Sequence, residues 1–167
     1  ITGIFMHVFN AFLTGYISYK LWNTKIVFYI TSLIYGLYPP LIFYAAEPVD
    51  TTLAITFMLI FVVFFIKGFR GEKETNFAVS GIFLGLSVLC RTNTVMLAGI
   101  LPGETYVTKK VPKSILTLLL ILAACGGAGY YLSEEFRLLP WQSGYLFYAA
   151  NKEGANGKYY KSTLNLA

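Results

Sequence analysis

Long uncharged runs divide this chain and leave only short charged segments between them. An apolar helix needs about 20 residues to cross a bilayer, and about 17 suffice when flanking Lys or Arg side chains reach the interface. By this measure four of the runs can cross alone, whereas 75–90 and 92–103 are marginal. Only 13% of the residues are charged, against about 25% in a typical soluble protein. The sequence therefore predicts an all-α integral membrane protein, a polytopic helix bundle built from the runs 1–19, 26–46, 51–66, 75–90, 92–103 and 114–133.

The basic residues between the runs indicate how the bundle is oriented. Alternate connections hold Lys20 and Lys25, then Lys67, Arg70 and Lys73, then Lys109, Lys110 and Lys113. The remaining connections hold Glu47 and Asp50 in one case and Arg91 alone in the other. By the positive-inside rule the basic connections are cytoplasmic. Because the net charge of +5 is spread between apolar runs and forms no continuous patch, we expect no nucleic-acid partner.

The expected organisation is a transmembrane bundle over 1–133 followed by an extracytoplasmic segment over 134–167. Residues 75–103 form a helical hairpin in this scheme, because each arm is shorter than a comfortable span. The last segment is rich in aromatic and turn residues, which favours a position against the membrane surface. The chain begins inside an apolar run at Ile1, and we expect it to be part of a longer protein.

Arg91 lies at the apex of the predicted hairpin, between two apolar arms. A fixed cation at membrane depth costs several kcal/mol unless an anion or a water-filled cavity receives it, so Arg91 predicts a functional site. The alternative is an anchor whose guanidinium reaches the interface or a lipid headgroup. On the first arm, Gly81 and Gly85 form a small-residue stripe that allows close helix approach.

Other residues outside the hairpin are candidates for a substrate pocket on the same side of the membrane. Glu47 and Asp50 either position a substrate or pair with Arg91, or they are solvated charges at a helix start. Tyr44 is either a pocket residue or an interfacial anchor. His7 stands alone on an apolar run, which indicates a packed or lumen-facing histidine rather than a metal ligand.

Two local patterns constrain the chain further. Pro39-Pro40 predicts a bend near Tyr38, because the residue before a proline avoids the helical region. Cys90 and Cys125 lie within or at the edge of apolar runs, which indicates unpaired packing residues rather than a disulfide.

Three stretches form a set whose order carries more information than any one of them. The first stretch, residues 37–44, contains Tyr-Pro in the later part of a span and is followed by Glu47. The second, residues 81–91, is a Gly-rich helix that ends in Leu-x-Arg. The third, residues 143–151 with 154–157, is an aromatic segment that contains Asn. Together they resemble the GT-C superfamily of integral-membrane glycosyltransferases, specifically the bacterial glycosyltransferase family 39 / protein O-mannosyltransferase-like group. The family commonly has proline after the arginine, where this chain has Thr92, and the acidic turn at 47–50 also departs from its pattern.

The resemblance implies a glycosyltransferase that moves a sugar from a polyprenyl-phosphate carrier to an extracytoplasmic acceptor, which is a protein, a lipid or a glycan. It implies a bacterial inner (plasma) membrane location with the active site on the extracytoplasmic side, Arg91 on the donor phosphate, and Asn151 as a pocket residue or a turn residue. The family's acidic catalytic pair lies in a first loop that would precede Ile1, so the chain is expected to be a fragment without its catalytic carboxylate. A divalent cation is left open as a cofactor.

Two other function classes fit an arginine at a broken helical pair. A polytopic transporter or flippase would use Arg91 to bind an anionic or lipid-linked substrate in transit, but it has no evident need for the segment 134–167. A membrane-embedded polysaccharide polymerase or ligase shares the lipid-phosphate chemistry. That class would have a long loop with its own basic and His residues, and the only histidine of this chain is His7.

Overall fold

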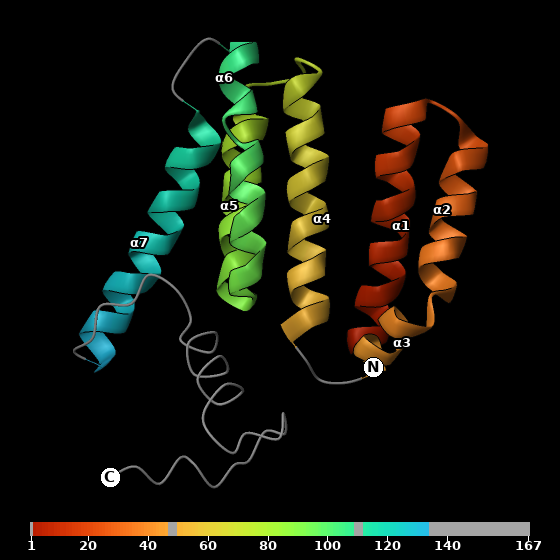
Figure 1. Ribbon diagram of the computed structural model, residues 1–167, viewed down its shortest axis with the longest axis horizontal. Coiled ribbons are helices and arrows are strands. Elements are labelled where there is room, and N and C mark those ends of the chain that lie inside the picture. Colours follow the sequence, from red (N-terminus) through yellow and green to blue (C-terminus); the bar gives the residue numbers. More distant parts are fainter. Residues whose placement is uncertain (1, 47–49, 109–111, 134–167) are drawn as a thin grey trace, which may run out of the picture.

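The computed structural model describes residues 2–46, 50–108 and 112–133, and within these ranges every regular element is a helix (Figure 1). The all-α prediction is therefore confirmed for the described residues. The elements are α1 (Thr2–Trp22), α2 (Lys25–Leu37), α3 (Pro39–Ala46), α4 (Asp50–Phe69), α5 (Thr75–Cys90), the 3-10 helix η1 (Thr92–Ile100), α6 (Gly103–Thr108) and α7 (Lys113–Ser133).

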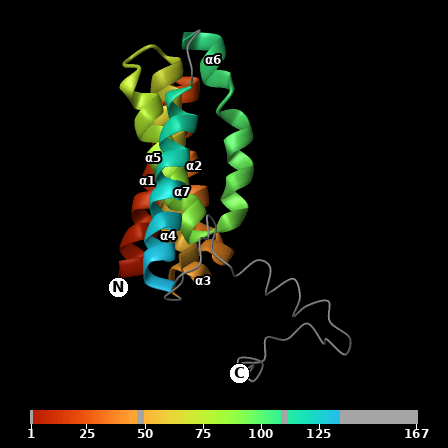
Figure 2. The same ribbon diagram turned by 90° about the vertical axis from the view of Figure 1, so that its left-hand side faces the viewer.

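The long helices lie side by side and alternate in direction, so the connections gather at two ends of the bundle (Figures 1 and 2). One end, called the basic end below, holds Lys20, Lys25, Lys67, Arg70, Lys73 and Lys113. The opposite end, called the Arg91 end, holds the start of α1, all of α3, the start of α4 and the turn between α5 and η1. The basic residues of the described connections thus lie at the end away from Arg91.

Membrane-crossing length is met by fewer helices than the sequence predicts. Residues Thr51–Phe69 of α4 are long and apolar enough to cross a bilayer, with a mean hydropathy of 2.3. α2 and α3 pass the same test only as a pair, and a bend of 62° separates them. α5 and residues Lys113–Ala128 of α7 are apolar but shorter. The described residues therefore hold one or two candidate spans, because polar residues interrupt α1 and the hairpin arms are short.

The bend between α2 and α3 confirms the break predicted near Tyr38. Tyr38 has extended backbone (φ −72°, ψ 109°) and ends α2, and Pro39 begins α3. A proline has no N–H, so Pro39 and Pro40 cannot donate to the carbonyls four residues earlier. These two carbonyls are those of Tyr35 and Gly36. The N–H of Tyr38 donates to the Tyr35 carbonyl at 3.3 Å, so this one has a donor.

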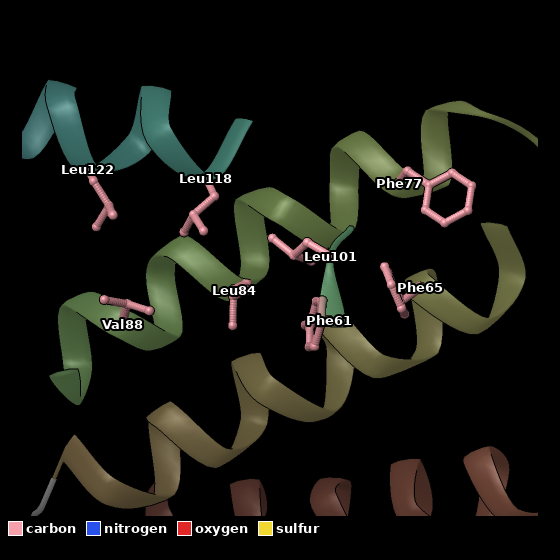
Figure 3. Close-up of a cluster of buried hydrophobic side chains, with 8 residues drawn as sticks. All are labelled: Phe61, Phe65, Phe77, Leu84, Val88, Leu101, Leu118 and Leu122. Carbon is pink, nitrogen blue, oxygen red and sulfur yellow. The ribbon is translucent and has the colours of Figure 1, made fainter. Parts of the chain in front are cut away.

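The core lies between α4, α5 and α7 (Figure 3). Edge-to-face rings join Phe65 of α4 to Phe77 of α5, with centroids 5.7 Å apart. α7 adds Leu118 and Leu122, and Leu101, which follows η1, is fully buried. Aromatic pairs of this geometry stabilise a core by about 0.5–1.5 kcal/mol beyond their buried area.

The small-residue stripe of α5 faces α7. A Cβ atom on Gly81 would overlap the Ser114 carbonyl oxygen and the Thr117 hydroxyl, and one on Gly85 would come within 2.9 Å of Ile121. Thr117 donates across this contact to the Ala78 carbonyl at 2.9 Å. The close helix approach predicted from the glycines is confirmed.

Charged groups tie the helices together at the basic end. Glu104 of α6 is buried and accepts hydrogen bonds from the backbone N–H groups of Lys113 (2.8 Å) and Ser114 (3.0 Å) and from the Ser114 hydroxyl. It therefore caps the start of α7, where unpaired N–H groups favour an anion. Lys20 donates to Glu72 at 3.3 Å, and this hydrogen bond raises the pKa of the Lys20 ammonium. Because the shift is upward, any stability it brings is present at neutral pH and lost only as the pH rises through that pKa.

Neither Cys90 nor Cys125 forms a disulfide, as the sequence predicts, but Cys125 is exposed and so is not the packing residue that was expected.

Candidate functional site

Arg91 is held by its backbone in the turn between two antiparallel helices. α5 ends at Cys90, and Arg91 takes an extended conformation (φ −141°, ψ 112°) before η1 begins. Its N–H donates to the Ser87 carbonyl at 2.8 Å. Its carbonyl accepts from the Thr94 N–H at 3.1 Å and from the Thr94 hydroxyl at 2.7 Å. Three hydrogen bonds therefore fix the position from which the side chain extends.

The turn of α5 before Arg91 is anchored to α4. The Ser87 hydroxyl is buried and donates to the Ala54 carbonyl at 3.0 Å. Val88, on the next position, is fully buried in the core. These contacts hold the end of α5 on a rigid neighbour, so the Arg91 backbone has little freedom to move relative to α4.

The Arg91 side chain is exposed, in contrast to the buried residues just before it. Among the residues that the structure describes, none forms a hydrogen bond or an ion pair with its guanidinium. A guanidinium is permanently charged and carries a planar fork of donors that matches two oxygens of a phosphate or carboxylate. An exposed guanidinium on a fixed backbone can therefore bind an anion that comes from outside the bundle.

The other candidates from the sequence have different outcomes. Tyr44 lies on α3 at the Arg91 end and is 40% exposed. Its carbonyl accepts from the Thr52 hydroxyl at 3.1 Å, which ties α3 to α4. Asp50 is the first residue of α4 at this same end. Glu47 and Asn151 lie outside the described residues. The structure thus brings Arg91, Tyr44 and the Asp50 backbone to one end of the bundle, with no contact between Arg91 and Tyr44 among the described interactions.

Thr51, beside Asp50, is a buried polar residue that sequence reasoning missed. It is 7% exposed, and its hydroxyl has no hydrogen-bond partner within the described part of the chain. Thr52, the next residue, does have one. A threonine pair in the first turn of an apolar helix is a weak signal in the sequence, because threonine often bonds its own helix backbone.

His7 has a structural role that follows from the double proline. Its Nε2 lies 3.1 Å from the Gly36 carbonyl oxygen, and its ring lies 5.4 Å from that of Tyr35. Gly36 is four residues before Pro40, which has no N–H to donate. An imidazole with a proton on Nε2 supplies the missing donor. His7 is therefore packed between α1 and α2, and the signal that predicts its partner is the proline four residues after Gly36.

Replacing His7 with phenylalanine is expected to destabilise the protein by about 1–3 kcal/mol, because the partly buried Gly36 carbonyl is then left without its donor. Phenylalanine keeps a ring beside Tyr35, so the loss reports the hydrogen bond rather than packing. Thermal unfolding in detergent, followed by circular dichroism, measures the change. His7→Gln retains a side-chain N–H donor and should recover part of the loss. If the phenylalanine variant is as stable as the wild type, the hydrogen bond makes no net contribution to stability.

No three His, Cys, Asp or Glu side chains gather into a metal-binding group within residues 2–46, 50–108 and 112–133.

Comparisons with protein-family models, with curated proteins and with solved structures returned no match to this chain.

Proposed function

We propose that this chain is part of a membrane glycosyltransferase, a polytopic helix bundle in which Arg91 binds the phosphate of a polyprenyl-phosphate sugar. The observation that carries the proposal is the exposed Arg91 guanidinium on a backbone fixed between two apolar helices. A fixed cation in an apolar setting is costly unless an anion or a water-filled cavity receives it. A lipid-linked phosphate brings its own apolar tail and so suits this position.

The distribution of polar and apolar side chains supports a lipid environment. Polar residues on α1 and α4 are buried, among them Asn10, which is fully buried. Large apolar residues of α1 face outward, and Phe5 is 76% exposed. Soluble proteins rarely expose large contiguous apolar patches. A bundle with its polar groups inside and its apolar groups outside is stable where hydrocarbon replaces water.

The length of α5 sets the depth of Arg91. Its 16 residues rise about 24 Å at about 1.5 Å per residue, less than the roughly 30 Å of hydrocarbon in a bilayer. If the basic end lies at the cytoplasmic interface, Arg91 is near the opposite edge of the hydrocarbon. A guanidinium on a long side chain reaches the headgroups from there. The phosphate of a polyprenyl carrier, whose tail lies in hydrocarbon, arrives at the same level.

In this reaction Arg91 has one role, which is to stabilise the negative charge on the leaving phosphate. An acceptor hydroxyl attacks the anomeric carbon of the sugar, a new carbon–oxygen bond forms, and the bond from that carbon to the phosphate oxygen breaks. Polyprenyl phosphate leaves with the bonding electron pair, and the hydroxyl proton passes to a general base outside the described residues. Negative charge grows on the phosphate as the bond breaks, and a fixed cation stabilises it.

Incubation of membranes that hold the full-length protein with a radiolabelled polyprenyl-phosphate sugar tests the proposal. We expect labelled sugar on an extracytoplasmic acceptor together with released polyprenyl phosphate, and neither product in membranes without the protein. Labelled carrier that crosses the bilayer with its sugar still attached would contradict transfer and favour a transporter or flippase.

A further inference from the structure

A pocket of about 220 Å³ lies between the end of α1 and the start of α2, which are at the basic end and away from Arg91. Tyr19, Lys25, Phe28 and Tyr29 line it. Drug-sized ligands occupy cavities of about 300–1,000 Å³. A pocket of this size therefore accepts one polar group of a larger molecule, the remainder of which must lie outside it.

The charged group that lines the pocket is a cation, Lys25. Lys25 is exposed, and no described residue pairs with its ammonium. The first turn of α2 contains no acidic residue. The described carboxylates at the basic end have other partners. Glu72 pairs with Lys20, Glu74 pairs with Lys113, and Glu104 caps α7. A phosphate in the pocket would supply the counter-charge that the protein lacks there.

An exposed apolar stripe leads away from this pocket along α2. Ile26, Ile30, Leu33 and Leu37 recur at helical spacing and are 50–67% exposed, and α2 has no buried residue. Residues three and four apart lie on one face of a helix. The stripe descends from the basic end toward α3, which is the course that an acyl chain takes below its headgroup.

We infer that the α1–α2 hairpin binds a phospholipid with an anionic headgroup, whose phosphate lies beside Lys25 and whose acyl chain follows the stripe of α2. Tyr19 and Tyr29 lie at the level of the headgroup, where tyrosine is enriched in membrane proteins. The inference depends on the membrane placement in the proposed function and is independent of the role of Arg91. It concerns the opposite end of the bundle.

Native mass spectrometry of the full-length protein in non-ionic detergent tests this inference with phosphatidylglycerol and phosphatidylcholine as probes. We expect the wild type to retain phosphatidylglycerol in preference to phosphatidylcholine. A lysine near anionic headgroups contributes about 1 kcal/mol, so Lys25→Gln should weaken phosphatidylglycerol binding about fivefold. Lys73→Gln is the matched control, because Lys73 is also exposed at the basic end but does not line the pocket. It should leave binding unchanged.

Two further measurements identify the source of the phosphate and test the role of the apolar stripe. Leu33→Asn should also weaken lipid binding, because it places an amide against the acyl chain. Millimolar inorganic phosphate should not displace the lipid, and displacement would reassign the pocket to a soluble phosphate. Equal losses for Lys25→Gln and Lys73→Gln, or no loss for Lys25→Gln, would overturn the inference even if sugar transfer is observed.

Discussion

Replacing Arg91 with alanine is expected to lower sugar transfer by the full-length protein about 10²- to 10³-fold, the usual loss when a fixed group that stabilises transition-state charge is removed. The phosphate gains negative charge as its bond to the sugar breaks, and the variant has no cation at that point. Folding should survive, because the side chain is exposed and such substitutions change stability by about 0.5 kcal/mol or less. The loss should therefore appear in turnover and not in the amount of inserted protein.

The matched control is Arg70→Ala. Arg70 is also exposed, but it lies at the basic end of the bundle. Transfer from a labelled polyprenyl-phosphate sugar is measured for both variants at equal protein content in the membrane, and only the Arg91 variant should lose activity. Arg91→Lys should recover part of the rate, because an ammonium keeps the charge but cannot form the two-pronged contact of a guanidinium. Unchanged turnover in Arg91→Ala would remove this residue from the donor site.

The break between α2 and α3 follows from local sequence rules. Pro39-Pro40 determines the bend at Tyr38, because two missing N–H donors and the restricted residue before a proline act within a few positions. A close helix approach at Gly81 is also predictable from the sequence, since small residues four apart mark a surface for close packing, but its partner α7 is not. Features of this kind need no knowledge of the partner.

Other features depend on which distant segments meet, and the sequence did not reveal them. Glu104 looks like an ordinary acidic residue after Pro102-Gly103, and its role appears only because α6 lies beside the first turn of α7. The return arm of the hairpin is a 3-10 helix rather than an α-helix. Such a helix rises about 2.0 Å per residue, so nine residues cover about 18 Å, and a short arm reaches farther along α5 than α-helical winding would allow.

The candidate site was only partly predictable for the same reason. Arg91 is recognisable alone, because a cation between apolar runs is unusual wherever the chain goes. The alternation of the basic connections predicts Tyr44 at the same end, and α3 does lie there. The anchoring of Ser87 to the Ala54 carbonyl joins residues 33 positions apart, and no spacing in the sequence indicates it.

Replacing Gly81 with alanine is expected to destabilise the bundle by about 1–3 kcal/mol, the usual cost of inserting atoms into a packed interior. The added Cβ would overlap the Ser114 carbonyl and the Thr117 hydroxyl. The backbone carbonyl cannot turn aside, so α5 and α7 must separate. Separation breaks the hydrogen bond from Thr117 to the Ala78 carbonyl and loosens Leu118 in the core. Gly81→Leu should cost more than Gly81→Ala, because the side chain pushes farther into α7.

Gly127→Ala provides the control for this prediction, since it makes the same change on the partner helix. A Cβ at Gly127 meets no atom within 4 Å, and alanine stabilises a helix relative to glycine by about 1 kcal/mol. Thermal unfolding of the purified variants in detergent, followed by circular dichroism, should therefore shift downward for Gly81→Ala and stay level or rise for Gly127→Ala. If the two variants unfold at the same temperature, α5 and α7 do not pack at Gly81 as closely as the structure shows. The position of Arg91 would then depend on α4, through the hydrogen bond from Ser87 to the Ala54 carbonyl.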